Sequence, residues 1–153
     1  MVSAPRGPVP DLPDLDPITA SSLARDLVGE RSARCGHGKA DPRFRLLAVG
    51  EGGRIADVGW WDAPEPAALT VDDELRRQVV LRLTSGSGDD PRAYIGVWER
   101  HGDLQPTTSD AAWWSAVRTV VSSPSALLVV TRYGWRAWPD GPQRQWARVR
   151  PRS

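Results

Sequence analysis

The sequence has almost no cysteine and no long apolar segment, and each shortage excludes a class of protein. Cys35 is the only cysteine among the 153 residues, so the chain has no internal disulfide and no zinc cluster built from thiolates. No apolar run approaches the ~20 residues that a membrane-spanning helix needs. The N-terminus also lacks a charged-then-apolar signal pattern. We therefore expect a cytoplasmic protein with no membrane partner.

Net charge is also scarce. The 20 basic and 19 acidic residues leave a net charge of +1, which gives no electrostatic reason to expect a nucleic-acid partner. Lys39 is the only lysine, so nearly all of the positive charge is arginine. The hydrophobic share of 40% and the charged share of 25% are ordinary for a soluble globular protein. A chain of this length supports one domain with a sizeable core.

Tryptophan, in contrast, is plentiful. The chain has eight, and each must be buried or used at an interface, because several exposed rings would create adhesive patches. In the adjacent pairs Trp60-Trp61 and Trp113-Trp114, one ring of each pair can be forced outward. Trp135 and Trp138 alternate with arginines near the C-terminus, and this pattern is typical of an interaction edge.

The first 17 residues differ in composition from the rest. They contain five prolines and few large apolar groups, so we expect residues 1–17 to form a disordered tail. Asp16 followed by Pro17 is typical of a helix N-cap and first turn. The spacing of the apolar residues that follow predicts a helix to about Ser32.

The rest of the chain alternates between strand and helix patterns. Apolar runs bounded by Gly, Pro and Asp predict strands, and apolar residues at helical spacing predict helices. The order α-β-β-α-β-α-β-β predicts an α/β fold, with one mixed sheet flanked by helices. The predicted strands are 43–49, 54–60, 94–98, 126–131, 135–138 and 145–149, and the later helices are one capped by Thr70 that reaches Leu83 and one over 109–122.

Only the stretch 94–110 places two acids and a histidine close together. Glu99 and His101 lie two apart just after a strand, and Asp110 begins the next helix, so all three can meet at the end of that strand. Such a set is a plausible three-ligand zinc site with room for water. A simpler interpretation is also open. Thr107 and Asp110 fit a capping box, His101 fits a solvated loop, and Glu99 with its neighbour Arg100 fits surface charge.

The same stretch resembles the metal-site segment of the JAB/MPN (JAMM) metalloproteases, in particular their bacterial branch and the RadC-type proteins. That family carries a strand of the type Y-x-G-x-W, then H-x-H-P, a short loop, and P-S-x-x-D at a helix start. The order of elements over about residues 40–140 is also similar: a hairpin, a helix, the motif strand, the motif helix and an apolar strand with a Trp- and Tyr-rich return. The matching residues are Tyr94, Gly96, Trp98, His101, Pro106, Thr107 and Asp110.

The resemblance implies a JAB/MPN-like domain over residues 18–150 and a role for each matched position. In the family, both histidines and the aspartate bind zinc, and the serine helps to hold the oxyanion. Glu99 stands at the first histidine, so the implied Zn²⁺ ligands are Glu99, His101 and Asp110, with Thr107 in the place of the serine. The family's catalytic glutamate comes from an early strand, where Asp41 is the nearest acid of this chain.

Two departures from the family pattern are typical of a non-catalytic relative: Glu99 in place of the first histidine ligand, and the shorter Asp41 in place of the catalytic glutamate. We therefore expect a diverged JAB/MPN-like domain, with hydrolysis weak or absent, that binds a protein or peptide partner at the former cleft. One alternative is an active zinc metallohydrolase that cleaves peptide or isopeptide bonds, with Thr107 and Asp41 as catalytic residues. The other is a Trp-rich interaction module that holds no metal.

Overall fold

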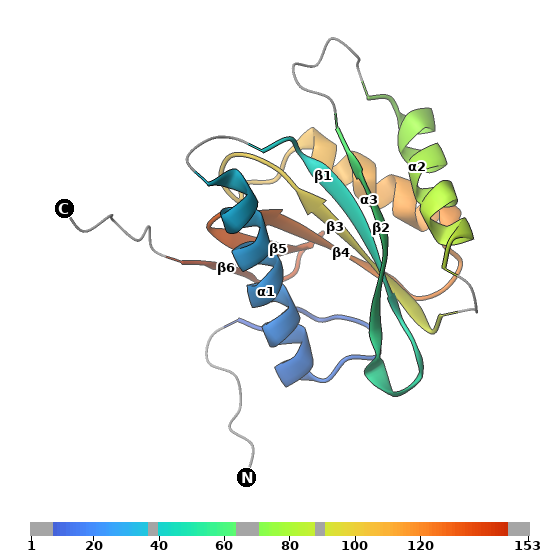
Figure 1. Ribbon diagram of the computed structural model, residues 1–153, viewed down its shortest axis with the longest axis horizontal. Coiled ribbons are helices and arrows are strands. Elements are labelled where there is room, and N and C mark those ends of the chain that lie inside the picture. The colour runs from blue at the N-terminus through green and yellow to red at the C-terminus, as the bar shows by residue number, and fades with distance from the viewer. Residues whose placement is uncertain (1–7, 37–39, 64–70, 88–90, 147–153) are drawn as a thin grey trace, which may run out of the picture.

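The computed structural model describes residues 8–36, 40–63, 71–87 and 91–146, in which three α-helices pack against one six-stranded sheet (Figure 1). A short 3₁₀ turn, Glu51–Gly53, joins the first two strands. The helices are α1 (Pro17–Cys35), α2 (Asp73–Ser85) and α3 (Thr108–Val120). The strands are β1 (Arg43–Val49), β2 (Ile55–Asp62), β3 (Ala93–Glu99), β4 (Ser125–Thr131), β5 (Gly134–Trp138) and β6 (Gln143–Gln145).

The strands lie in the order β2-β1-β3-β4-β5-β6. Only β3 and β4 are parallel, and all other neighbours are antiparallel. The sheet is therefore mixed, and helices cover both of its faces. The predicted α/β class with a mixed sheet flanked by helices is confirmed. The parallel pair also positions the candidate site, because the carboxyl ends of β3 and β4 lie at the same edge of the sheet.

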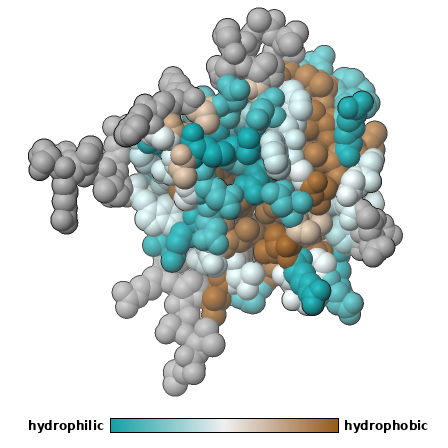
Figure 2. All heavy atoms as spheres, viewed as in Figure 1, coloured by the Kyte–Doolittle hydropathy of each residue, from teal (hydrophilic) through white to brown (hydrophobic). Residues whose placement is uncertain are grey.

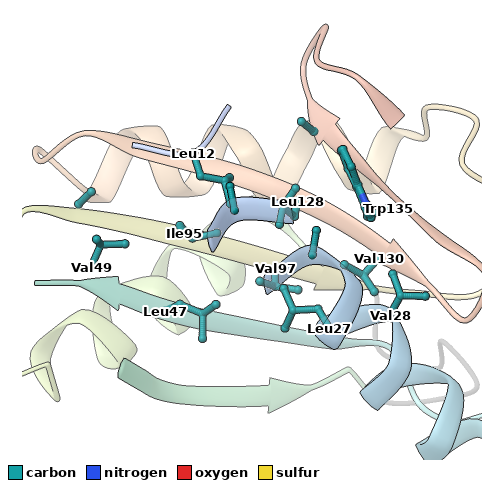
Figure 3. Close-up of a cluster of buried hydrophobic side chains, with 14 residues drawn as sticks. Leu12, Leu27, Val28, Leu47, Val49, Ile95, Val97, Leu128, Val130 and Trp135 are labelled. Atoms are coloured by element: carbon teal, nitrogen blue, oxygen red, sulfur yellow. The ribbon is translucent and has the colours of Figure 1, made fainter. Parts of the chain in front are cut away.

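Helix α1 covers one face of the sheet (Figures 1 and 3). Its apolar residues meet inward-pointing side chains of β1, β3, β4 and β5, and Figure 3 shows how these side chains point between the helix and the strands. Strands β3 and β4 contribute alternate residues to this layer, as the period of two in a strand requires. The layer includes Leu27, Val28, Leu47, Ile95, Val97, Leu128, Val130 and Trp135.

Helices α2 and α3 cover the opposite face, and the packing there is centred on Trp113 of α3. The Trp113 ring stacks on Phe44 at a centroid distance of 4.3 Å and contacts Trp98 at 5.3 Å. A Cβ atom on Gly96 would lie only 3.3 Å from the Phe44 ring. The glycine of the Y-x-G-x-W pattern is therefore explained by the close packing of an aromatic ring over β3.

The N-terminal segment differs from the expectation of a tail over residues 1–17. Leu12 is 3% exposed and belongs to the α1 layer of the core, and Val9 and Leu15 pack against the same layer. Residues 1–7 lie outside the described part of the chain. Composition did not predict this packing, because the segment is rich in proline and only three apolar side chains, Val9, Leu12 and Leu15, hold it against the core. The predicted cap is confirmed, since the Asp16 side chain accepts from the Thr19 N–H at 2.8 Å.

The tryptophans divide between core and surface. Trp60 is 54% exposed, whereas its neighbour Trp61 is partly buried and packs against the layer under α2 and α3, so this adjacent pair turns one ring outward. Trp135 is also 1% exposed and points into the α1 layer, so it cannot form the interaction edge that its position suggested. Trp138 points to the other face, where it lines a shallow hollow with Trp114 of α3.

The edge strand β2 contains an irregularity. Leu46 pairs with Gly59 and Leu47 pairs with Asp57, so Val58 is an extra residue and forms a β-bulge. Because of this extra residue, Asp57 and Trp60 lie on the same face of the sheet although they are three apart in sequence. On the side seen in Figure 2, hydrophilic residues alternate with smaller hydrophobic areas.

Within the described residues, none of the three helices has both the length and the apolar character that crossing a membrane requires.

Candidate functional site

The site proposed from the sequence lies where β3 ends and α3 begins. Side chains at the end of β3 alternate between the two faces of the sheet. Trp98 packs in the layer under α2 and α3, and Val97 packs in the layer under α1. Glu99 follows Val97 toward α1, and Arg100 follows Trp98 toward α3. This alternation decides which partners each charged group meets.

Asp110 is fully buried and is paired with Arg100. The Arg100 Nε lies 2.7 Å from Asp110 Oδ1 and its Nη2 lies 2.9 Å from Oδ2, which is a two-point pair. The Asp110 Oδ2 also accepts from the Thr107 N–H at 3.1 Å, and the Thr107 hydroxyl accepts from the Asp110 N–H at 3.2 Å. Both halves of the predicted capping box are thus present.

The same guanidinium organises the loop between β3 and α3. Arg100 Nη1 donates to the carbonyls of His101 at 3.0 Å and Asp103 at 2.6 Å, and Nη2 donates to the carbonyl of Gln105 at 2.9 Å. The loop therefore wraps around a buried cation, and Arg100 is only 8% exposed. A positive charge is thus held beside Asp110 by the chain itself.

Glu99 is also fully buried, but on the opposite face of the sheet. Its carboxylate accepts from Arg34 at the end of α1, and Arg45 of β1 lies 3.6 Å from its second oxygen. Burial raises the pKa of Glu99 above its usual 4.5, while the charges of Arg34 and Arg45 act against that rise. Burial in turn lowers the pKa of Arg34.

The other residues proposed for the site have different neighbours. His101 Nδ1 lies 3.5 Å from Arg31 Nη2, so this histidine is on the α1 side of the sheet end. The backbone carbonyl of Asp41 accepts from Arg31 at 2.8 Å, and the Asp41 side chain is exposed. Thr107 is exposed, and its hydroxyl is occupied by the cap of α3.

The three proposed zinc ligands do not form one ligand set. Asp110 faces α3 and both of its oxygens are bonded to Arg100, whereas Glu99 faces α1 and is held by arginines. In the part of the chain that the structure describes, no three His, Cys, Asp or Glu side chains are grouped so that they could hold a metal ion. This arrangement does not fit zinc, because a cation is already paired with each carboxylate.

Sequence reasoning missed the arginines. Glu99 and Arg100 were open to interpretation as surface charge, yet they are 0% and 8% exposed. Arg34 and Arg45 lie more than 50 residues before Glu99 in the sequence, so no local pattern predicts that they contact it. One signal was available for Arg100: a charged residue follows an apolar strand directly, and an aspartate stands at the third position of the next helix.

A hollow of about 510 Å³ opens beside these residues, at the carboxyl ends of the parallel strands β3 and β4. In α/β proteins such strand ends are the usual place for ligands, and the volume lies in the range of small-molecule and peptide sites. The hollow is lined by Cys35, Arg100, His101, Gly102, Asp103, Leu104, Thr131, Arg132, Tyr133 and Gln145.

Comparisons with protein-family models, with curated proteins and with solved structures give no match.

Proposed function

We propose that this chain is a diverged JAB/MPN-like domain in which arginine–carboxylate pairs have replaced the metal centre. It acts by binding a protein or peptide segment in the hollow at the ends of β3 and β4, and it does not hydrolyse that segment. The chain would thus be a non-catalytic relative of zinc-dependent peptidases and isopeptidases.

The observation that carries the proposal is the position of Arg100. Its guanidinium occupies the space between the end of β3 and the start of α3, and it bonds to both oxygens of Asp110. An aspartate at this point of the motif would be a metal ligand in the family that the sequence resembles. Here its charge is already balanced, so a divalent cation would have to displace a buried guanidinium and its loop carbonyls.

Two further observations support the proposal. From β1 to β5, the elements follow the order that the resemblance implies: a hairpin (β1 and β2), a helix (α2), the motif strand β3, the motif helix α3, and the apolar strand β4 with its return β5. A hollow lies beside the motif, and its wall of mixed polar and apolar groups is suited to a peptide backbone with side chains.

Metal content is the first test. We expect purified protein that has been equilibrated with zinc and then dialysed to hold far less than one zinc per chain, as measured by elemental mass spectrometry. The His101→Ala variant should give the same value. One zinc per chain that is lost in His101→Ala would overturn the proposal and favour the zinc-enzyme alternative.

Peptide binding is the second test. Peptides selected from a displayed random heptapeptide library should shift the backbone amide resonances of Gly102, Thr131 and Tyr133 in ¹⁵N-labelled protein. A bulky Gln145→Trp substitution in the wall of the hollow should abolish these shifts. Gln143→Trp, two residues earlier on the same strand and outside the hollow, is the matched control. Peptides that bind equally well to both variants would place the binding surface elsewhere.

A further inference from the structure

We propose that the hollow recognises a carboxylate of its peptide ligand, which is bound by Arg132 together with the backbone N–H groups of Gly102 and Leu104. This inference deepens the proposed function and rests on it, because it names the group by which a peptide would be held.

The loop geometry provides two backbone donors. The carbonyls of His101 and Asp103 point at the Arg100 guanidinium, at 3.0 and 2.6 Å. In a trans peptide the N–H of the next residue points opposite to the carbonyl. The N–H groups of Gly102 and Leu104 therefore point away from Arg100, on two residues that line the hollow. Among the described residues, neither N–H has an acceptor.

Backbone N–H groups that line a concave loop, here on the alternate residues 102 and 104, can bind anions. Gly102 has a φ of +90°, in the region that favours glycine, and this conformation turns the loop so that the carbonyls converge on the guanidinium. The buried cation thus determines the direction of the donors. The same Arg100 charge, though paired with Asp110, lies behind them.

Arg132 supplies the third donor group. It follows β4 directly and lines the same hollow. Its Nη2 has one long bond of 3.3 Å to the Gly36 carbonyl, and its guanidinium lies 5.2 Å from the Tyr133 ring centroid. Within the described residues it forms no ion pair with a carboxylate, unlike Arg100, which also lines the hollow. A guanidinium with one long hydrogen bond and no paired carboxylate is suited to bind the carboxylate of a ligand.

One acid, Asp103, also lines the hollow, and its charge should limit the affinity for an anion. The Asp103 side chain is exposed and its Oδ1 accepts from the Gln105 N–H at 2.9 Å, which closes the turn. Its negative charge should repel an anionic ligand. Removal of this charge should therefore strengthen binding, which offers a gain-of-affinity test that no loss of folding could imitate.

The experiment uses three small probes and the full chain. N-acetyl-Gly-Leu carries a terminal carboxylate, its amide N-acetyl-Gly-Leu-NH₂ carries none, and N-acetyl-Asp-Leu-NH₂ carries a side-chain carboxylate only. Each is titrated into ¹⁵N-labelled protein, and the amide shifts of Gly102 and Leu104 give the dissociation constant. Inorganic phosphate at the same concentration is the control for non-specific anion binding.

We expect the free acid to bind and the neutral amide to bind at least ~10-fold more weakly, because a charge-assisted contact is lost. Arg132→Gln should weaken binding of the free acid by a similar factor. Arg118→Gln, whose guanidinium lies 5.8 Å from the Trp114 ring on the far face of α3, is the matched control and should change nothing. Asp103→Asn should tighten binding about twofold to fivefold.

Binding of the third probe distinguishes the source of the carboxylate. If it binds as well as the free acid, the hollow accepts acidic side chains, and if it does not, the hollow selects chain ends. Equal binding of acid and amide, equal shifts with phosphate, or no effect of both Arg132→Gln and Asp103→Asn would overturn the inference. The proposed function would survive any of these results if the selected heptapeptides still bind at the hollow. Should Arg132→Gln fail to fold, Asp103→Asn and the amide probe decide alone.

Discussion

Two buried carboxylates at the end of β3 have arginine partners, but the two sites are built differently. Asp110 receives two parallel bonds from Arg100 and one from a backbone N–H, and all of these groups come from residues 100–110. Glu99 receives one close contact from Arg34 and a longer one from Arg45, which belong to α1 and β1. Its second oxygen is buried without a hydrogen-bond partner among the described residues.

The difference shows that how fully a buried carboxylate is hydrogen-bonded depends on where its partners lie in the sequence. A local loop can adjust its backbone until a buried charge is fully bonded, as the loop does for the Arg100 guanidinium and the Asp110 carboxylate. A site shared between separate elements must also satisfy the packing of those elements. Arg45, for example, divides its bonds among Glu30, Asp57 and Glu99. We therefore expect the Asp110 site to be the more important for stability and the Glu99 site to be the more sensitive to pH.

The largest effect is expected from Arg100→Met. This change leaves the buried Asp110 carboxylate and three carbonyls unpaired, and we expect the free energy of unfolding to fall by about 3–5 kcal/mol. Arg34→Met should cost only about 1 kcal/mol, because the Arg34 side chain is 27% exposed and Arg45 still faces Glu99. Urea unfolding followed by tryptophan fluorescence measures both.

A double variant shows whether the unpaired charge is the cause. Arg100→Met combined with Asp110→Leu removes both charges and should regain part of the loss, since an apolar pair of similar size can replace a buried ion pair. If Arg34→Met proved as costly as Arg100→Met, the contrast between the two sites would be mistaken.

A smaller effect is expected from pH at Glu99. Burial raises its pKa above 4.5 in the folded state, against the charges of Arg34 and Arg45, so the folded protein binds this proton more tightly than the unfolded chain does. Its contribution to stability is then complete below pH 4.5 and is lost as pH rises through the folded pKa. The free energy of unfolding of the wild type, minus that of Glu99→Gln, should therefore decrease as pH rises from 4.5, in urea titrations at several pH values. A difference that increases with pH would show that the arginines outweigh burial.

The smallest effect is expected from the cap itself. Thr107→Ala removes the hydroxyl that accepts from the Asp110 N–H, and we expect a loss of about 1 kcal/mol. Thr108→Ala, one residue later in the first turn, should change stability by less than about 0.5 kcal/mol. Thermal unfolding of the two variants and of Thr107→Ser, which keeps the hydroxyl, gives the comparison. Equal losses at both threonines would argue against the capping role.

Much of the fold followed from local patterns. The strand patterns over 43–49 and 94–98 and the helix pattern over 109–122 match β1, β3 and α3 to within two residues, because each has a clear apolar period. The second helix is correctly expected but begins later than Thr70, with Asp72 as its N-cap. That boundary was difficult because Thr70, Asp72 and Asp73 are each suited to capping a helix.

The site was less predictable. The capping box followed from the spacing of Thr107 and Asp110, and it is present. The expected meeting of Glu99 with Asp110 failed because adjacent residues of a strand face opposite sides, so Arg100 meets Asp110 and Glu99 meets α1. The long-range partners of Glu99 depend on how α1 packs, which no local pattern reveals. Zinc binding and the role of a partner stay predictions.

The bulge in β2 has a consequence for self-association. A regular outermost strand offers a straight ladder of free backbone groups that a second chain can extend, and such growth leads to aggregates. The extra Val58 breaks that ladder partway along β2, and the same irregularity turns Asp57 and Trp60 to one side. The bulky ring and the nearby charge then obstruct a flat neighbour. We therefore expect the bulge to disfavour strand-to-strand association at this edge, although Trp60 is exposed there.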